Sequence, residues 1–179
     1  MILVIGGPPG SGKTTVAERW AAARGAVLVS AGTRFRAMAK ERGLNLEAFG
    51  RAAERDPSID RALDKAVLAE IRAHLAKGRD VVVDGRIQAY LLGKEKIPCV
   101  KVLIDAPLEV RSKRIAGREG TTVEAAKREI VARERSEGIR YKSIYGIDVG
   151  DTRIFDLVVD SRERTPDEIV ARIAARVEG

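Results

Sequence analysis

The residues with the clearest chemical meaning form a run near the N-terminus that matches the pattern G-x-x-x-x-G-K-[ST]. Glycines in such a loop let backbone N–H groups converge on phosphate oxygens, and the following helix adds the positive end of its dipole. The lysine can reach the β- and γ-phosphates, and the next hydroxyl can bind Mg²⁺. The run and the threonine after it predict a site for a nucleoside triphosphate, made by Gly7, Pro8, Pro9, Gly10, Ser11, Gly12, Lys13, Thr14 and Thr15.

The segments around this loop predict the elements that position it. Residues 15–24 read as a helix with Val16, Ala17, Trp20 and Ala23 on one side. Helical patterns separate short apolar runs of strand length, which is typical of an α/β protein with a parallel sheet. Several runs do not alternate with polar residues, as expected of strands covered by helices on both faces. The five predicted strands are residues 3–6, 26–29, 80–84, 100–105 and 155–160.

Two intervals between these strands are longer than simple crossovers, at about residues 32–77 and 111–151. Both are rich in charge. Insertions at the carboxyl ends of parallel strands are where such folds place binding lids. We therefore expect one domain over residues 1–179, with two binding regions inserted in it. The segment from Thr165 predicts an N-cap, a first-turn proline and a C-terminal helix.

Composition limits the function classes. The 179 residues suffice for one domain with a real core, and no signal peptide or membrane span is visible, so we expect a cytoplasmic protein. Cys99 is the single cysteine, which excludes a disulfide framework and a cysteine metal cluster. The net charge is +7, and 23 of the 33 basic residues are arginines, which suits either nucleic acid or a site that grips several phosphates. One asparagine, one glutamine and 33% charged residues favour a thermophilic source.

The phosphate loop occurs in several enzyme classes, which the rest of the sequence narrows. A guanine-reading Asn-Lys-x-Asp motif is absent, because Asn45 is followed by Leu46. No glutamine lies near a predicted strand end in the manner of the RecA or transporter ATPases, and the chain is short for either class. A small phosphotransferase remains.

Two further segments resemble the nucleoside monophosphate kinases. Residues 30–36 directly follow the second predicted strand, and in that family a similar turn opens the region that binds the acceptor phosphate. Residues 81–86 resemble the third-strand segment that meets the acceptor nucleotide. Asp84 there could bind Mg²⁺ or its water, or the acceptor. The resemblance implies substrate contacts from Ser30, Gly32, Arg36, Asp84, Gly85 and Arg86, with Thr14 and Asp84 at the metal.

Arginines cluster in the second long interval. Arg114 lies in a helical pattern with arginines at three- and four-residue spacing on either side, and Arg133 and Arg140 share one face of a later helix. In the nucleoside monophosphate kinases such an arginine-rich lid folds over the triphosphate and neutralises the phosphoryl group in transfer. The resemblance implies that Lys13, Arg114, Arg133 and Arg140 are catalytic.

The sequence as a whole most resembles the archaeal-type cytidylate kinases. The segments that carry this resemblance are residues 106–111, 140–148 and 155–160. A further shared stretch, residues 56–60, implies that Asp60 contacts the acceptor base. Thr33 departs from the family, which carries an aspartate after the Ser-Ala-Gly word. The resemblance implies a three-layer P-loop kinase fold, and transfer of a phosphoryl group from ATP·Mg²⁺ to CMP and dCMP.

Two alternatives remain open at this level. Another small kinase of the same fold, for UMP, AMP or a non-nucleotide acceptor, differs only in a few pocket side chains. An RNA-associated ATPase would use the basic surface, but aromatic residues for stacking on bases make up only 4% of the chain. We expect no membrane or nucleic-acid partner and, because no apolar interface stripe is evident, a monomer.

Overall fold

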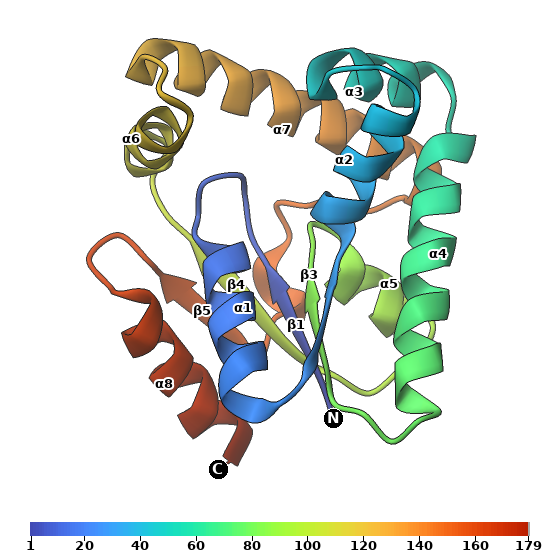
Figure 1. Ribbon diagram of the computed structural model, residues 1–179, viewed down its shortest axis with the longest axis vertical. Helices are drawn as coiled ribbons and strands as arrows, with labels where there is room; N and C mark the ends of the chain where they lie inside the picture. Colours follow the sequence, from blue (N-terminus) through green and yellow to red (C-terminus); the bar gives the residue numbers. More distant parts are fainter. Residues whose placement is uncertain (179) are drawn as a thin grey trace.

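The computed structural model, which describes residues 1–178, confirms the five-stranded parallel sheet (Figure 1). The strand order across the sheet is β2-β3-β1-β4-β5, and every neighbouring pair is parallel. The strands are β1 (Ile2–Gly6), β2 (Val27–Ser30), β3 (Val81–Asp84), β4 (Val100–Asp105) and β5 (Leu157–Asp160).

The fifth strand begins two residues later than the apolar run predicts. A short 3₁₀ helix, Thr152–Ile154, precedes it. The Asp156 backbone N–H donates to the Lys101 carbonyl, and the Asp156 carboxylate accepts from the Lys101 N–H at 2.8 Å. These bonds fasten the chain to the edge of β4, so regular pairing starts only at Leu157.

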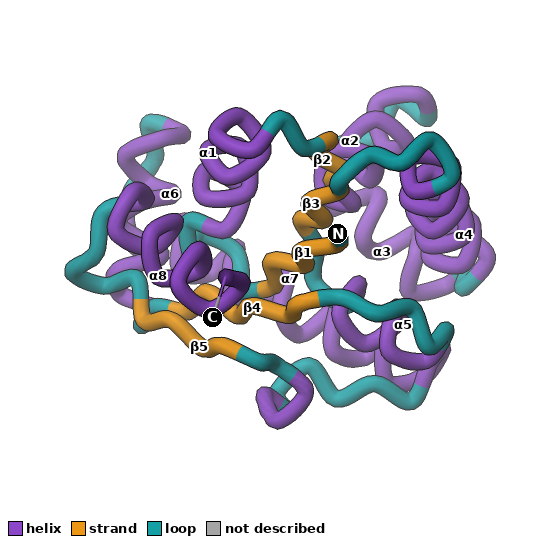
Figure 2. Tube along the Cα trace, turned by 90° about the horizontal axis from the view of Figure 1, so that it is seen from below, coloured by secondary structure: helices purple, strands orange, loops and turns teal. Residues whose placement is uncertain are grey.

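Helices cover both faces of the sheet, as predicted (Figure 2). Helices α1 and α8 pack on one face, and α4 and α5 pack on the other. The helices are α1 (Lys13–Arg24), α2 (Ala31–Glu41), α3 (Leu46–Arg55), α4 (Ser58–Leu75), α5 (Gln88–Lys94), α6 (Leu108–Glu119), α7 (Val123–Tyr145) and α8 (Pro166–Glu178). Within residues 1–178, none is long and apolar enough to cross a membrane.

The apolar core divides along the pleat of the sheet. Leu3 and Ile5 of β1 face α1 and α8, whereas Ile2 and Val4 face α4 and α5. Successive strand residues point to opposite faces, so a strand without alternation can fill both cores. Trp20 of α1 is fully buried between that helix and the sheet. The central strands are therefore fixed on both sides, and with them the loops at their carboxyl ends.

The predicted packing face of the first helix is correct except at one position, and the predicted start of the last helix is correct. In α1 the fourth buried residue is Ala21 rather than Ala23, because a step of four residues from Ala17 keeps the same face. In α8 the Thr165 hydroxyl accepts from the Glu168 N–H, and the Glu168 carboxylate accepts from Thr165, which confirms the predicted cap.

The two long intervals form the helices that stand beyond the carboxyl ends of the strands (Figure 1). The interval 32–77 holds α2, α3 and α4, but α4 packs on the sheet as a crossover helix. The interval 111–151 holds most of α6 and all of α7. Helix α7 runs across the top of the molecule and packs against α6 and α3. The division of the chain into binding regions remains a prediction.

Candidate active site

The phosphate loop connects β1 to α1, and close packing explains its glycines. A Cβ at Gly7 would lie 2.1 Å from the Ile104 carbonyl oxygen, and one at Gly10 would lie 2.9 Å from the Arg111 carbonyl oxygen. Both residues also have positive φ, which glycine adopts without strain. Gly12 is the N-cap of α1 and has a left-handed conformation. Because glycine has no side chain, it offers no side-chain acceptor to the first N–H groups of the helix. Those donors remain available for an anion.

Helix α6 is fastened to the back of this loop by Arg111. Its guanidinium is buried and donates to the carbonyls of Pro9 at 3.1 Å and Ala106 at 2.9 Å. The Nη1 nitrogen, which donates to Pro9, also donates to the Glu134 carboxylate of α7 at 2.9 Å. Arg111 therefore supports the loop and does not line the cavity described next.

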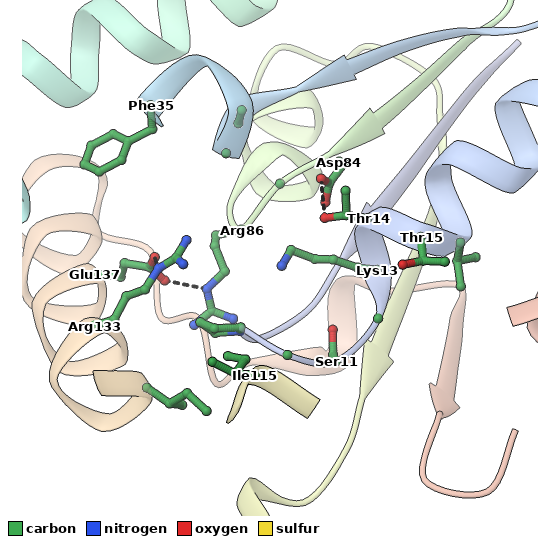
Figure 3. Close-up of a pocket in the computed structure, with 18 of the residues that line it drawn as sticks. Ser11, Lys13, Thr14, Thr15, Phe35, Asp84, Arg86, Ile115, Arg133 and Glu137 are labelled. Carbon is green, nitrogen blue, oxygen red and sulfur yellow. Dashed lines mark hydrogen bonds and ion pairs between the residues drawn. The ribbon is translucent and has the colours of Figure 1, made fainter. Parts of the chain in front are cut away.

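A cavity of about 790 Å³ opens above the phosphate loop, at the carboxyl edge of the sheet (Figure 3). Its walls come from the loop, α2, the end of β3, α6 and α7. The structure brings together at this cavity most of the predicted site residues: Pro9, Gly10, Ser11, Gly12, Lys13, Thr14, Thr15, Gly32, Arg36, Asp84, Gly85, Arg86, Arg114, Arg133 and Arg140. Four others do not line it, namely Gly7, Pro8, Ser30 and Asp60.

Lys13 extends into the middle of the cavity (Figure 3). Burial lowers the pKa of its ammonium group to about 8, although the Asp84 carboxylate acts in the opposite direction. The guanidinium groups of Arg133 and Arg86 lower it further. A polyphosphate would supply the negative charge that this group of three cations lacks.

Asp84 ends β3 beside the loop and is almost fully buried. One of its oxygens, Oδ2, accepts from the Thr14 hydroxyl at 2.9 Å and from the Ser30 hydroxyl at 3.1 Å. The other, Oδ1, is buried and accepts no hydrogen bond from any residue that the structure describes. A carboxylate and a hydroxyl at this spacing form the oxygen donor set that Mg²⁺ prefers, since protein sites often give it only one or two ligands besides phosphates and water.

A buried carboxylate that the sequence analysis missed lies opposite Lys13. Glu137 of α7 accepts from the Nε of Arg86 at 2.6 Å and from the Nε of Arg133 at 2.8 Å (Figure 3). Burial alone would raise the pKa of Glu137, but the two guanidinium groups hold it at about 2. Glu137 is therefore ionised at any working pH. Glu137 follows Arg133 by four residues in a helical segment, and this spacing in the sequence could have predicted their ion pair.

Arg114 contacts the phosphate loop directly. It donates from Nη1 to the Ser11 carbonyl at 3.3 Å, and from Nη2 to the Ser161 carbonyl at 2.6 Å. The buried Ser161 hydroxyl donates in turn to the Ser11 carbonyl at 2.8 Å. Ser161, which follows β5, was not predicted as a site residue. Arg114 thus lies against the phosphate loop and lines the cavity.

The two arginines of α2 have different surroundings. Arg36 is exposed at the cavity, and its Nη2 donates to the Thr33 hydroxyl at 2.9 Å. Arg34 instead pairs with Glu70 of α4 and does not line the cavity. Thr33 therefore orients Arg36. Of these two arginines, only Arg36 lines the cavity.

Arg140 and Asp60 were both predicted to contact nucleotides, but here they contact each other. The Arg140 Nε lies 2.9 Å from the Asp60 Oδ2, and both side chains are buried. Burial raises the pKa of Asp60, and the Arg140 charge partly offsets that rise. Arg140 still lines the cavity, whereas Asp60 lies behind it.

The carboxylate on that wall of the cavity is Asp64, one helical turn after Asp60. It accepts from the Gln88 amide at 3.1 Å and from the Tyr145 hydroxyl at 2.7 Å. Burial raises the pKa of Asp64 to about 6. A Cβ on Gly85 would lie 1.9 Å from the Gln88 Oε1, so glycine is required for this packing. The sequence analysis missed this cluster.

The site contains no histidine: His74, the only one in the chain, is half-buried near the end of α4 and does not line the cavity. The arrangement therefore suits charge stabilisation and alignment of phosphates rather than proton abstraction. This is the chemistry that phosphoryl transfer requires.

Comparison with known proteins agrees with this description. The cytidylate kinase of Methanopyrus kandleri is 40% identical over 185 residues, covering 99% of this chain and 93% of the relative. The cytidylate kinase of Aeropyrum pernix is 46% identical over 158 residues, covering 88% of each chain. That of Pyrococcus furiosus is 40% identical, covering 99% of this chain and 88% of the relative.

Solved structures support the fold. A protein from Eubacterium ventriosum described as uncharacterized superposes with a TM-score of 0.74 at 18% identity, covering 100% of this chain and 99% of the other. The shikimate kinase of Aquifex aeolicus superposes with a TM-score of 0.58 at 22% identity, covering 100% and 97%. Both share the P-loop kinase architecture seen here. The sequence model of the cytidylate kinase-like family matches residues 2–163, and this chain therefore belongs to that family.

Proposed function

We propose that this protein transfers the γ-phosphoryl group of ATP to CMP, giving ADP and CDP, with Mg²⁺ as the metal ion. The observation that carries the proposal is a single cavity that joins the phosphate loop to a polar wall suited to a cytosine ring. The relatives named cytidylate kinase support the same substrate. We expect dCMP to be accepted as well, and the protein to act as a monomer without nucleic acid.

The chemical step needs no general base, because the acceptor phosphate is already ionised at neutral pH. Catalysis then consists of alignment and charge stabilisation. The loop N–H groups and Lys13 hold the β- and γ-phosphates of the donor, and Arg114 covers the donor side. Arg36 and Arg86 hold the acceptor phosphate in line. Arg133 stabilises the charge on the group in transfer, a role worth roughly 10³–10⁵ in rate for arginines in related enzymes.

Thr14 and Asp84 would hold the magnesium ion. The unpartnered Oδ1 of Asp84 supports this assignment, because a buried carboxylate oxygen rarely lacks a hydrogen bond or a cation. When bound there, the metal ion would supply positive charge to offset the negative charge that develops on the phosphates during transfer. The Ser30 hydroxyl contributes indirectly, since it fixes the orientation of Asp84.

Base selection follows from the fixed orientation of Gln88. Its Oε1 accepts from the Ile87 N–H at 3.2 Å, so its Nε2 must face Asp64. The wall therefore offers an N–H donor beside a carboxylate acceptor. Cytosine presents the complementary pair, a ring-nitrogen acceptor beside an amino donor. Uracil presents the opposite pair, so the same pose would set its carbonyl oxygen against Asp64.

The test is to measure ADP release from ATP·Mg²⁺ with CMP, dCMP, UMP, AMP and GMP offered separately, against a control without acceptor. Turnover that favours CMP and dCMP supports the proposal. A preference for UMP or AMP would leave the phosphoryl-transfer site in place but make the base assignment wrong. ADP release that ignores every acceptor would contradict the proposal and favour an ATPase.

A further inference from the structure

Glu137 is an unusual residue for a phosphate site, because a carboxylate at this position repels the ligands that the cavity is built to hold. It is one of two carboxylates that line the inner part of the cavity near Lys13, the other being Asp84. Only Asp84 has a place in the proposed metal site. The side chain of Glu137 is 6% exposed and that of Arg86 is 14% exposed. Its role must therefore be sought in what it does to its neighbours.

The atoms that Glu137 contacts are informative. It accepts from the inner Nε of both arginines: its Oε2 bonds Arg86 and its Oε1 bonds Arg133. Neither arginine donates a hydrogen bond from a terminal Nη nitrogen to any protein atom within residues 1–178. Each guanidinium is thus held along one edge, and the other donors of its planar fork stay available.

The two arginines come from different walls of the cavity. Arg86 follows β3, on the side of the proposed acceptor, and Arg133 belongs to α7, the helix that crosses above the cavity. Glu137 is the bridge between them, and both arginines are close enough to Lys13 to lower its pKa. Without the carboxylate, two guanidinium groups and an ammonium group would repel one another and separate.

We infer that Glu137 is a positioning residue for phosphoryl transfer, which holds Arg86 and Arg133 by their Nε groups so that their terminal nitrogens form one cradle for the acceptor and transferred phosphates. This inference rests on the proposed function and extends it. Glu137 touches no substrate itself. It acts through the two arginines and, as a permanent anion, takes no part in proton transfer.

The first test compares Glu137→Gln with wild type in CMP-dependent turnover. The amide keeps the shape but can accept only one of the two Nε–H bonds, so kcat is expected to fall about 10–10²-fold, the usual cost of a misaligned catalytic group. Glu124→Gln, an exposed change in the first turn of α7, is the matched control and should leave kcat unchanged. A kcat within twofold of wild type for Glu137→Gln would overturn the inference.

A second variant separates position from charge and guards against misfolding. Glu137→Asp keeps the negative charge but withdraws it by one methylene, so the inference predicts a lowered kcat here as well. Wild-type kcat in this variant would overturn the positioning role, because the negative charge alone would then be sufficient. A double-mutant cycle adds a readout that a structural role would not move: in an Arg133→Ala background, Glu137→Gln should cost at least threefold less than in wild type. Equal costs in both backgrounds would contradict a role through Arg133.

The orientation can also be observed without turnover. In ¹⁵N spectra of the unliganded protein, the Nε–H signals of both Arg86 and Arg133 should exchange slowly with water in wild type, whereas at least one of them should exchange rapidly in Glu137→Gln. Unprotected signals in wild type would contradict the inference even if the protein phosphorylates CMP. Protected signals in a protein that releases ADP without regard to acceptor would leave the positioning in place and overturn the proposed function alone.

Discussion

Arg140 of α7 and Asp60 of α4 form a buried ion pair, with 2.9 Å between Nε and Oδ2. The Arg140 guanidinium also lies over the rings of Phe35 and Tyr141, so its position is fixed on several sides. The pair ties the helix above the cavity to the helix on the sheet. Arg140 therefore serves to place α7, in addition to any contact that it makes with a nucleotide.

The first prediction concerns the stability of that pair. Asp60→Ala leaves a buried guanidinium without its counter-ion, which should lower the free energy of unfolding by about 3–5 kcal/mol. The double replacement Asp60→Leu with Arg140→Met should regain most of that loss, because it removes both charges. Urea unfolding measures both values. A loss below about 1 kcal/mol for Asp60→Ala would show that the pair does not hold α7 against α4.

Lys13 gives a prediction in which activity and stability change in opposite directions. Its pKa is lowered in the folded state, so the unfolded chain binds more protons between about pH 8 and the ordinary lysine range. Charged Lys13 therefore costs stability at pH 7. Lys13→Met should abolish turnover yet raise Tm at pH 7, and the gap in Tm should narrow as pH rises above 8. A lower Tm for the variant at pH 7 would show that the fold needs the ammonium group.

Arg36 should act on the acceptor rather than the donor. Arg36→Ala is expected to raise the KM for CMP at least tenfold and to leave the KM for ATP within about twofold. Arg34→Ala, two residues away and paired with Glu70, is the matched control and should change neither. Steady-state kinetics with each substrate varied in turn would measure both constants. Unchanged KM for CMP would remove Arg36 from the acceptor site.

Asp64 predicts a base preference that depends on pH. Its pKa of about 6 means that it becomes protonated, and able to donate to a uracil carbonyl, as pH falls below that value. The ratio of kcat/KM for CMP to that for UMP should therefore fall between pH 8 and pH 5.5. Ionisation of the acceptor phosphate affects both substrates alike and cancels in the ratio. Asp64→Asn should give a low ratio at every pH, and a wild-type ratio in this variant would exclude Asp64 from base selection.

The fold and the phosphate loop could be predicted because their signals are local. Strand-length apolar runs, the glycine spacing before Lys13 and the cap at Thr165 each depend on residues adjacent in the chain. The predicted start of the fifth strand was wrong because a long-range contact determines it: hydrogen bonds between Asp156 and β4 precede the regular strand. Local pattern cannot supply such contacts.

The acidic residues of the site show the same limit. Glu137 shares a helix face with Arg133, and Asp64 lies one turn after Asp60, yet their partners Arg86 and Gln88 come from another segment. Which helix faces meet is a property of the packed structure. The sequence therefore predicted the basic residues that the structure brings to the cavity, but not Glu137, which holds two of them in place, nor Asp64, which orients Gln88.

The most direct test of the central claim follows the transferred group itself. Wild-type protein is incubated with ATP labelled in the γ-phosphate, Mg²⁺ and CMP, and the products are separated. The account predicts that the label leaves ATP only when CMP is present and appears in the β-phosphate of CDP. Label that appears as inorganic phosphate, at the same rate with and without CMP, would contradict it.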